Sequence, residues 1–167
     1  NMVMKSFEDI VNGSIVQKDK KFYLKVKGQS EFEMGLVSEG YRKMATIMYL
    51  ILSGSLTKDS ILFWDEPETN MNPKMIKPMC DALTELAKMG VQIFVATHNY
   101  FQQYFNMEAI YNKDSKIKYN FISLYRNSDS GEINAQCVDN LDDMTENAIM
   151  KEFDDLYDRE QRFIYGD

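Results

Sequence analysis

The stretch Ile61-Leu62-Phe63-Trp64-Asp65-Glu66-Pro67-Glu68 is the most informative pattern in the chain. Four apolar residues run directly into two adjacent carboxylates and a proline. A continuous apolar run of this length predicts a β-strand that is buried on both faces, as in parallel sheets. Ionised carboxylates are costly to bury at the end of such a strand unless a cation meets them there. The pattern therefore predicts a site for magnesium carried on a nucleotide, with an acidic surface turn as the simpler alternative.

Length and composition fit one globular domain. The chain has 167 residues, of which 44% are apolar and 27% are charged, and this is enough for one core but short for two. No apolar run approaches the length that spans a membrane, and the start does not resemble a signal peptide. Cys80 and Cys137 lack the spacing of a metal or redox motif. We therefore expect a single domain over 1–167, located in the cytoplasm with reduced thiols.

Acidic residues are concentrated at the end of the chain. Residues 139–167 contain ten acids and three bases, a net charge of −7 that equals the charge of the whole chain, so the remainder is neutral. Clustered Lys and Arg bind phosphate backbones, so we do not expect this closing acidic segment to hold DNA. It is also too short to form a nuclease domain.

Hydrophobic periodicity predicts an α/β fold. A strand, a helix begun by Asn72 and Pro73, and a second strand would form a right-handed parallel crossover. A later pair of strands, 119–126 and 133–138, is expected to be antiparallel. The other predicted strands are 14–16, 21–27, 29–34, 61–64 and 91–96, and the predicted helices are 6–11, 41–53, 73–88 and 146–157.

Two further segments place polar groups where a ligand could bind. Ser38-Glu39-Gly40 precedes a predicted helix, whose first N–H groups attract anions, although a serine there can also be a simple helix cap. His98 follows the strand 91–96, which would bring it close to Glu66 at the carboxyl edge of the sheet. Ligands of open α/β sheets bind at that edge, but a lone histidine is often only structural.

The order of these segments resembles the C-terminal half of an ABC-type ATPase domain, a P-loop NTPase fold. The resemblance is tight over roughly residues 35–99 and loose elsewhere. In chain order, it assigns the signature motif to Val-Ser-Glu-Gly-Tyr at 37–41, Walker B to 61–65, the catalytic glutamate to Glu66, the D-loop to 69–73 and the switch histidine to His98.

Details of the motif favour one branch of that superfamily. Asp-Glu-Pro-Glu-x-Asn-x-x-Pro at 65–73 looks like the soluble AAA-family ATPases related to RecF, to SMC repair proteins and to phage-defence ATPases of the overcoming-lysogenization-defect kind. Glu68 stands where transporter ATPases usually have Thr, and Asn72 where they have Asp. Two alternatives stay open: the ATPase subunit of an ABC transporter, and a binding module of the same fold that no longer hydrolyses ATP.

The resemblance implies a mechanism in which ATP lies between two identical head domains. Ser38 and the Gly40 amide would contact the γ-phosphate of ATP held by the partner head. Asp65 would hold Mg²⁺ through water, Glu66 would act as the general base, and His98 would bond the γ-phosphate. DNA repair or phage defence would be the process, with at most an indirect association with DNA and none with a membrane.

One part of such an ATPase is missing from these residues. A P-loop needs Gly-x-x-x-x-Gly-Lys-Ser/Thr, and none of the eight glycines is followed by lysine. We therefore expect the chain to be the C-terminal part of a longer or separately encoded ATPase, and to be inactive without the upstream Walker A segment.

This expectation predicts that the chain alone does not bind Mg-ATP, because no loop cradles the β- and γ-phosphates. Isothermal titration of Mg-ATP into the purified chain should give no binding heat, and Asp65→Ala should behave identically. Binding by the chain that disappears in Asp65→Ala would contradict the assignment, because the acidic edge would then hold nucleotide without a P-loop.

Overall fold

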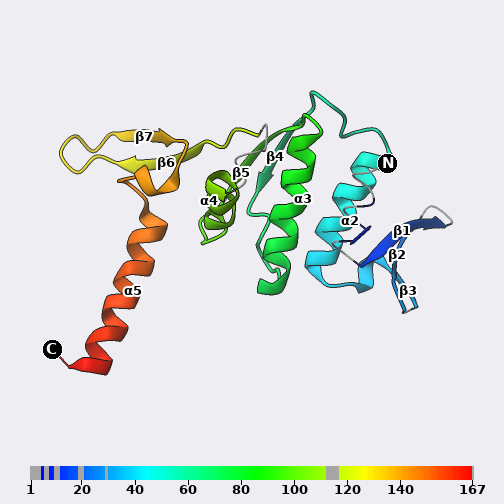
Figure 1. Cartoon of the computed structure of the whole chain (residues 1–167), viewed down its shortest axis with the longest axis horizontal. Coiled ribbons are helices and arrows are strands. Elements are labelled where there is room, and N and C mark those ends of the chain that lie inside the picture. Colours follow the sequence, from blue (N-terminus) through cyan, green and yellow to red (C-terminus); the bar gives the residue numbers. More distant parts are fainter. Residues whose placement is uncertain are drawn as a thin grey trace. The chain divides into compact units, whose positions relative to one another are not determined.

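The computed structural model describes residues 5, 8–9, 12–18, 21–28, 30–111 and 117–166, and Figure 1 traces the whole chain. Contacts divide the chain into two compact units, Asn1–Thr97 and His98–Asp167. A single domain over 1–167 stays a prediction. The predicted helix 6–11 falls mostly outside the described residues.

The first unit begins with a small antiparallel sheet, followed by a helix. Strands β1 and β2 form the predicted hairpin, and β3 pairs with the other edge of β2. A 3-10 turn then leads into α2, whose N-cap residue is Ser38. The bounds are Gly13–Lys18 for β1, Lys21–Val26 for β2, Glu31–Glu33 for β3, Met34–Leu36 for η1 and Glu39–Leu52 for α2.

The centre of the first unit is the predicted parallel crossover. Strands β4 and β5 are parallel and in register from Ile61 opposite Gln92 to Asp65 opposite Ala96. Gly90 ends the connecting helix with a φ of +91°, a conformation that suits glycine. The bounds are Ile61–Asp65 for β4, Pro73–Met75 for the 3-10 turn η2, Ile76–Lys88 for α3 and Gln92–Ala96 for β5.

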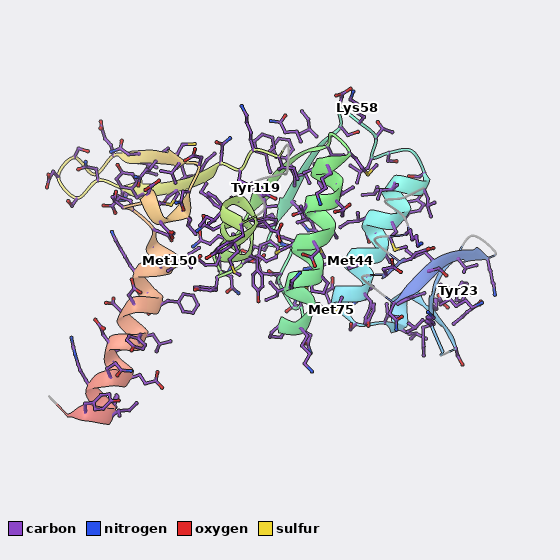
Figure 2. All side chains as sticks on the ribbon, viewed as in Figure 1. Tyr23, Met44, Lys58, Met75, Tyr119 and Met150 are labelled. Carbon is purple, nitrogen blue, oxygen red and sulfur yellow. The ribbon has the colours of Figure 1, made fainter. Side chains whose placement is uncertain are left out.

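Helices α2 and α3 pack together through apolar side chains at helical spacing. Figure 1 shows the two helices side by side, and Figure 2 labels Met44 on α2. Methionine is flexible and fills irregular gaps between helices. The most deeply buried apolar residues of the two helices, each at most 1% exposed, are Met44, Ile47, Met48, Met79, Cys80, Ala82, Leu83 and Leu86.

The prediction that the 61–64 strand is buried on both faces is wrong. Exposure alternates along β4, and Phe63 is 74% exposed. Phe63 stacks on Phe94 of β5 with ring centroids 4.7 Å apart, so the two rings shelter mainly each other. The described sheet has only two strands here, and one of its faces is left uncovered.

The second unit contains the predicted antiparallel pair between two helices. Strands β6 and β7 are in register from Phe121 opposite Val138 to Arg126 opposite Ile133. Helix α4 was not predicted, because its apolar residues do not gather on one face. The bounds are Gln102–Tyr111 for α4, Phe121–Arg126 for β6, Ile133–Val138 for β7, Leu141–Asp143 for the 3-10 turn η3 and Ala148–Tyr165 for α5.

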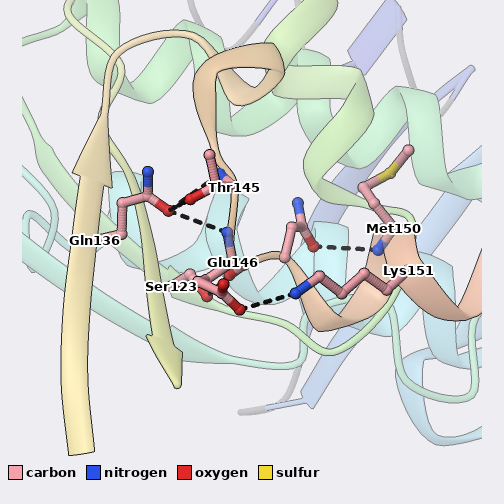
Figure 3. Close-up of polar contacts among 7 residues, drawn as sticks. Ser123, Gln136, Thr145, Glu146, Met150 and Lys151 are labelled. Atoms are coloured by element: carbon pink, nitrogen blue, oxygen red, sulfur yellow. Dashed lines mark hydrogen bonds and ion pairs between the residues drawn. The ribbon is translucent and has the colours of Figure 1, made fainter. Parts of the chain in front are cut away.

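Side-chain caps fix the start of α5 after β7, as Figure 3 shows. The side-chain oxygen of Gln136, Oε1, accepts from the backbone N–H groups of Thr145 and Glu146, both at 3.1 Å. Asn147 caps the helix by accepting from the Met150 N–H at 3.2 Å. The predicted helix 146–157 is therefore present, but it begins two residues later and continues to Tyr165. Within the described ranges, no helix combines the length and apolar character needed to cross a membrane.

The buried α2–α3 contact predicts a large loss of stability for Leu83→Ala. Leu83 is 1% exposed, and truncating such a leucine removes apolar contacts and leaves a cavity, which lowers the free energy of unfolding by about 2–5 kcal/mol. Urea unfolding followed by Trp64 fluorescence measures the change. Leu36→Ala is the control, because Leu36 is 81% exposed and its truncation should change stability by less than about 0.5 kcal/mol. Equal losses of unfolding free energy in the two variants would contradict the assignment of Leu83 to the core.

Candidate functional site

The site is built around residues 66–71, the turn that follows β4, called here the 66–71 turn. The Glu66 N–H donates to the Ala96 carbonyl at 2.8 Å, so the turn begins beside the end of β5. Glu66 has a φ of +47° and Asn70 one of +57°. Such values are strained for residues other than glycine and cluster at functional sites. The backbone is therefore held here in a conformation that it would not adopt freely.

A hydrogen bond within the turn orients the candidate general base. The Thr69 hydroxyl donates to Glu66 Oε2 at 2.7 Å, and the Thr69 N–H donates to the Glu66 carbonyl at 3.1 Å. Glu66 is half-buried, whereas the neighbouring Asp65 is exposed at the end of β4. One carboxylate is thus oriented by the turn, and the other is open to a ligand.

The buried acid of this segment is Glu68, not the Asp65–Glu66 pair whose burial the sequence suggested. Glu68 is 6% exposed, and its Oε1 accepts a hydrogen bond from the Thr97 hydroxyl. Its Oε2 is also buried and has no hydrogen-bond partner among the described residues. Alternation along the strand leaves Asp65 outside, while the turn folds Glu68 inward.

Helix α2 contacts the same turn from another direction. Lys43 Nζ donates to the Pro67 carbonyl at 2.9 Å and to the Thr69 carbonyl at 2.6 Å. Gly40 is buried, and a Cβ placed on it would lie 3.2 Å from the Met71 side chain and 3.1 Å from that of Met75, labelled in Figure 2. The absence of a side chain at Gly40 therefore lets the start of α2 lie close to the turn.

Ser38 does not use its side chain as a helix cap. It occupies the N-cap position of α2 with extended backbone, but its hydroxyl makes no capping hydrogen bond, and the residue is exposed. Its carbonyl accepts from the Arg42 N–H at 3.0 Å, the first bond of the helix. The hydroxyl and the first N–H groups of α2 are thus available to an anion.

The predicted site residues fall into two groups. Asp65 and Glu66 adjoin the end of β5, and Gly40 is joined to them through the 66–71 turn. His98 is exposed and opens the second unit, two residues after Ala96 ends β5. Its role as the switch histidine stays a prediction.

Magnesium is the ion that the resemblance implies for Asp65. In the described part of the chain, no group of three or more His, Cys, Asp or Glu side chains is arranged to hold a metal. Mg²⁺ at nucleotide sites needs fewer protein ligands, since it keeps several waters and is bound by one or two carboxylates plus phosphates. An exposed Asp65 at the end of a strand fits that kind of site.

Three residues of this arrangement were not assigned roles from the sequence. Lys43, Thr97 and Thr69 act through contacts with carbonyls or carboxylates that are distant in sequence or formed by the turn itself. Glu68 was noticed only as a departure from the transporter pattern. That departure is the signal in the sequence that could have pointed to the buried Glu68, because a glutamate in place of a small polar residue needs room and a hydrogen-bond donor.

The parallel crossover and its flanking helices form an α/β fold similar to that of SMC ATPase heads. Residues 4–101 match the protein family described as "AAA domain, putative AbiEii toxin, Type IV TA system", and the chain belongs to that family. The predicted resemblance and the α/β fold class are therefore confirmed. No curated protein matches the chain in sequence.

Solved structures with a similar fold include SMC ATPase heads. A structure from work on ATP-driven dimerization and DNA-stimulated activation of SMC ATPases is 14% identical with a TM-score of 0.58, covering 93% of this chain and 91% of that one. The Smc head from Pyrococcus furiosus bound to the ScpA C-terminal domain is 12% identical with a TM-score of 0.56. The match covers 95% of this chain and 36% of that one. The SMC head from Thermotoga maritima is 16% identical with a TM-score of 0.55, and the match covers 81% of this chain and 47% of that one. The chain thus spans less than half of the last two structures.

The contacts of Lys43 predict a local effect of Lys43→Met. Losing a charged donor to two carbonyls should lower the free energy of opening of the 66–71 turn by about 1–3 kcal/mol. Amide hydrogen exchange at Thr69 and Met71 measures this change. Lys74→Met, at an exposed lysine of the adjacent η2 turn, should leave the exchange unaltered. Equal exchange in the wild type and in Lys43→Met would show that the two hydrogen bonds of Lys43 do not stabilise the turn.

Proposed function

We propose that this chain is the C-terminal part of a soluble ABC-type ATPase that binds and hydrolyses ATP between two head domains. The observation that carries the proposal is the 66–71 turn, which presents an oriented Glu66 next to an exposed Asp65 at the carboxyl end of parallel strands. Ligands of open α/β sheets bind at that edge. The family match supports an ATPase domain.

The two acids of the motif take different roles in this proposal. Asp65 holds Mg²⁺, which when bound neutralises charge on the β- and γ-phosphates. Glu66 accepts a proton from the attacking water, and Thr69 keeps the carboxylate turned for this role. Phosphoryl transfer depends mainly on positioning and charge stabilisation, so a base fixed by a strained turn suits it.

Ser38, Gly40 and His98 contact the phosphates in this proposal. The Ser38 hydroxyl, which makes no capping bond to the helix, and the N–H groups at the start of α2 bind the γ-phosphate of ATP held by the partner head. His98 donates a hydrogen bond to the γ-phosphate after β5. Loss of any of these donors removes stabilisation of charge that develops in the transition state.

A P-loop must come from residues other than these 167. The uncovered face of β4 and β5 supports this part of the proposal, because parallel sheets are normally covered on both faces. Phe63 and Phe94 are large apolar side chains on that face, and they stay 74% and 42% exposed here. We propose that the upstream Walker A segment completes both the sheet and the nucleotide site, and that this chain is inactive without it.

The biological setting rests on the named relatives. The family description names a toxin of a type IV toxin–antitoxin system, and one similar structure comes from work on ATP-driven dimerization and DNA-stimulated activation. The dimerization and DNA stimulation named for the SMC ATPases support a homodimer of heads and a link to DNA. We propose a role in phage defence or DNA repair, in which DNA is contacted indirectly. A cytoplasmic location without membrane association completes the proposal.

The test is ATP turnover by the protein completed with its upstream Walker A segment. The completed protein should hydrolyse Mg-ATP, and the 167-residue chain should not. Glu66→Gln should lower kcat by about 10²-fold or more, because the general base is removed, while KM changes little. Glu85→Gln is the matched control, since Glu85 pairs with Lys88 on α3, and it should keep wild-type turnover.

Two outcomes would contradict the proposal. A completed protein that binds ATP without turnover would favour the binding module. Copurification of the completed protein with a membrane subunit that stimulates it would favour the transporter ATPase.

A further inference from the structure

Glu68 is held in a way that stability alone does not explain. Its carboxylate is 6% exposed, one oxygen accepts from the Thr97 hydroxyl, and the other is buried without a partner among the described residues. A buried acceptor that lacks a partner is destabilising, whereas an apolar pair of similar shape could fill such a space nearly without loss. A destabilising buried carboxylate beside a candidate active site suggests a functional role.

We propose that Glu68 is a positioning residue for ATP hydrolysis, which acts with Thr97 to hold the 66–71 turn against the end of β5. This inference rests on the function proposed above. Glu68 itself does not touch the nucleotide in this account. It acts through Glu66, whose position decides how well the attacking water is aligned.

The contacts around Glu68 show how the turn is fixed from two sides. Lys43 of α2 holds the carbonyls of Pro67 and Thr69, the residues on either side of Glu68. The Glu68 side chain is bonded to Thr97, just after β5. Without the Glu68–Thr97 bond, the turn still has the backbone bond from the Glu66 N–H to the Ala96 carbonyl at the end of β5, but that bond holds only the first residue of the turn.

The two residues of the Glu68–Thr97 bond are also close in sequence to both predicted catalytic residues. Glu66 lies two residues before Glu68, and His98 directly follows Thr97. Glu66 has a φ of +47°, so its conformation depends on outside contacts that oppose relaxation. A small displacement of a general base can lower a rate by as much as about 10²-fold.

The experiment compares three variants in the ATPase completed by its upstream segment. Thr97→Val removes the hydroxyl but keeps the shape, and it should lower kcat roughly 10- to 100-fold with KM for ATP unchanged. Thr97→Ser keeps the hydroxyl and should retain kcat within about twofold. The double variant Glu68→Leu with Thr97→Val removes both polar partners, so its urea midpoint should return to that of the wild type while kcat stays low.

The double variant separates positioning from stability. Recovery of kcat together with the urea midpoint would overturn the proposal, because Glu68 and Thr97 would then matter only for folding. Wild-type kcat in Thr97→Val would overturn it as well.

A second measurement separates this inference from the proposed function. In the 167-residue chain, Thr97→Val should speed amide exchange at Thr69 and Met71, whereas Thr97→Ser should not. Unchanged exchange in Thr97→Val overturns the positioning role even if the completed protein hydrolyses ATP. Absence of turnover in the completed wild type, with exchange altered as expected, contradicts the proposed function and with it the catalytic purpose of the anchor.

Discussion

The hydrogen bonds that hold the 66–71 turn connect three segments that are far apart in the sequence. Lys43 of α2 donates to two carbonyls of the turn, while Ala96 at the end of β5 accepts the Glu66 N–H and Thr97 just after it donates to Glu68. Together these contacts keep Glu66 at a positive φ that a free chain would rarely adopt. Because the same turn connects β4 to η2 and α3, its geometry also determines how the crossover begins. Structure and the proposed chemistry therefore depend on the same few bonds.

The turn links the two ends of the proposed nucleotide site within one head. Helix α2 starts with Ser38 and Gly40, which would contact ATP on the partner head, and its Lys43 holds the turn that carries Glu66. A shift at the start of α2 would therefore move Glu66 through the close contact at Gly40 and the two hydrogen bonds of Lys43. Gly40 permits this close approach because it has no side chain to meet Met71 and Met75.

Much of the fold could be predicted from the sequence, because its elements have strong local signals. The predicted strand 133–138 and the predicted helix end at residue 88 coincide with β7 and with the end of α3. Burial of β4 was predicted wrongly, since four consecutive apolar residues do not reveal whether a second layer covers Phe63. Helix α4 lacks an apolar face, and its buried Asn106 is instead fixed by accepting from the Leu141 N–H at 2.9 Å. The positions of Asp65, Glu66 and Gly40 followed from motif order, but the Glu68 and Lys43 anchors arise only from tertiary contacts.

Trp64, the only tryptophan in this chain and the residue before Asp65, offers the most direct measurement. We would record its emission in the completed protein while titrating Mg-ATP, with Trp64→Phe to subtract any signal from the upstream segment. If nucleotide binds at this edge of the sheet, Trp64 emission should show a saturable change that is absent in the 167-residue chain and lost in Asp65→Ala. A change that persists in Asp65→Ala, or its absence in a completed protein that hydrolyses ATP, would contradict the placement of nucleotide at this edge of the sheet.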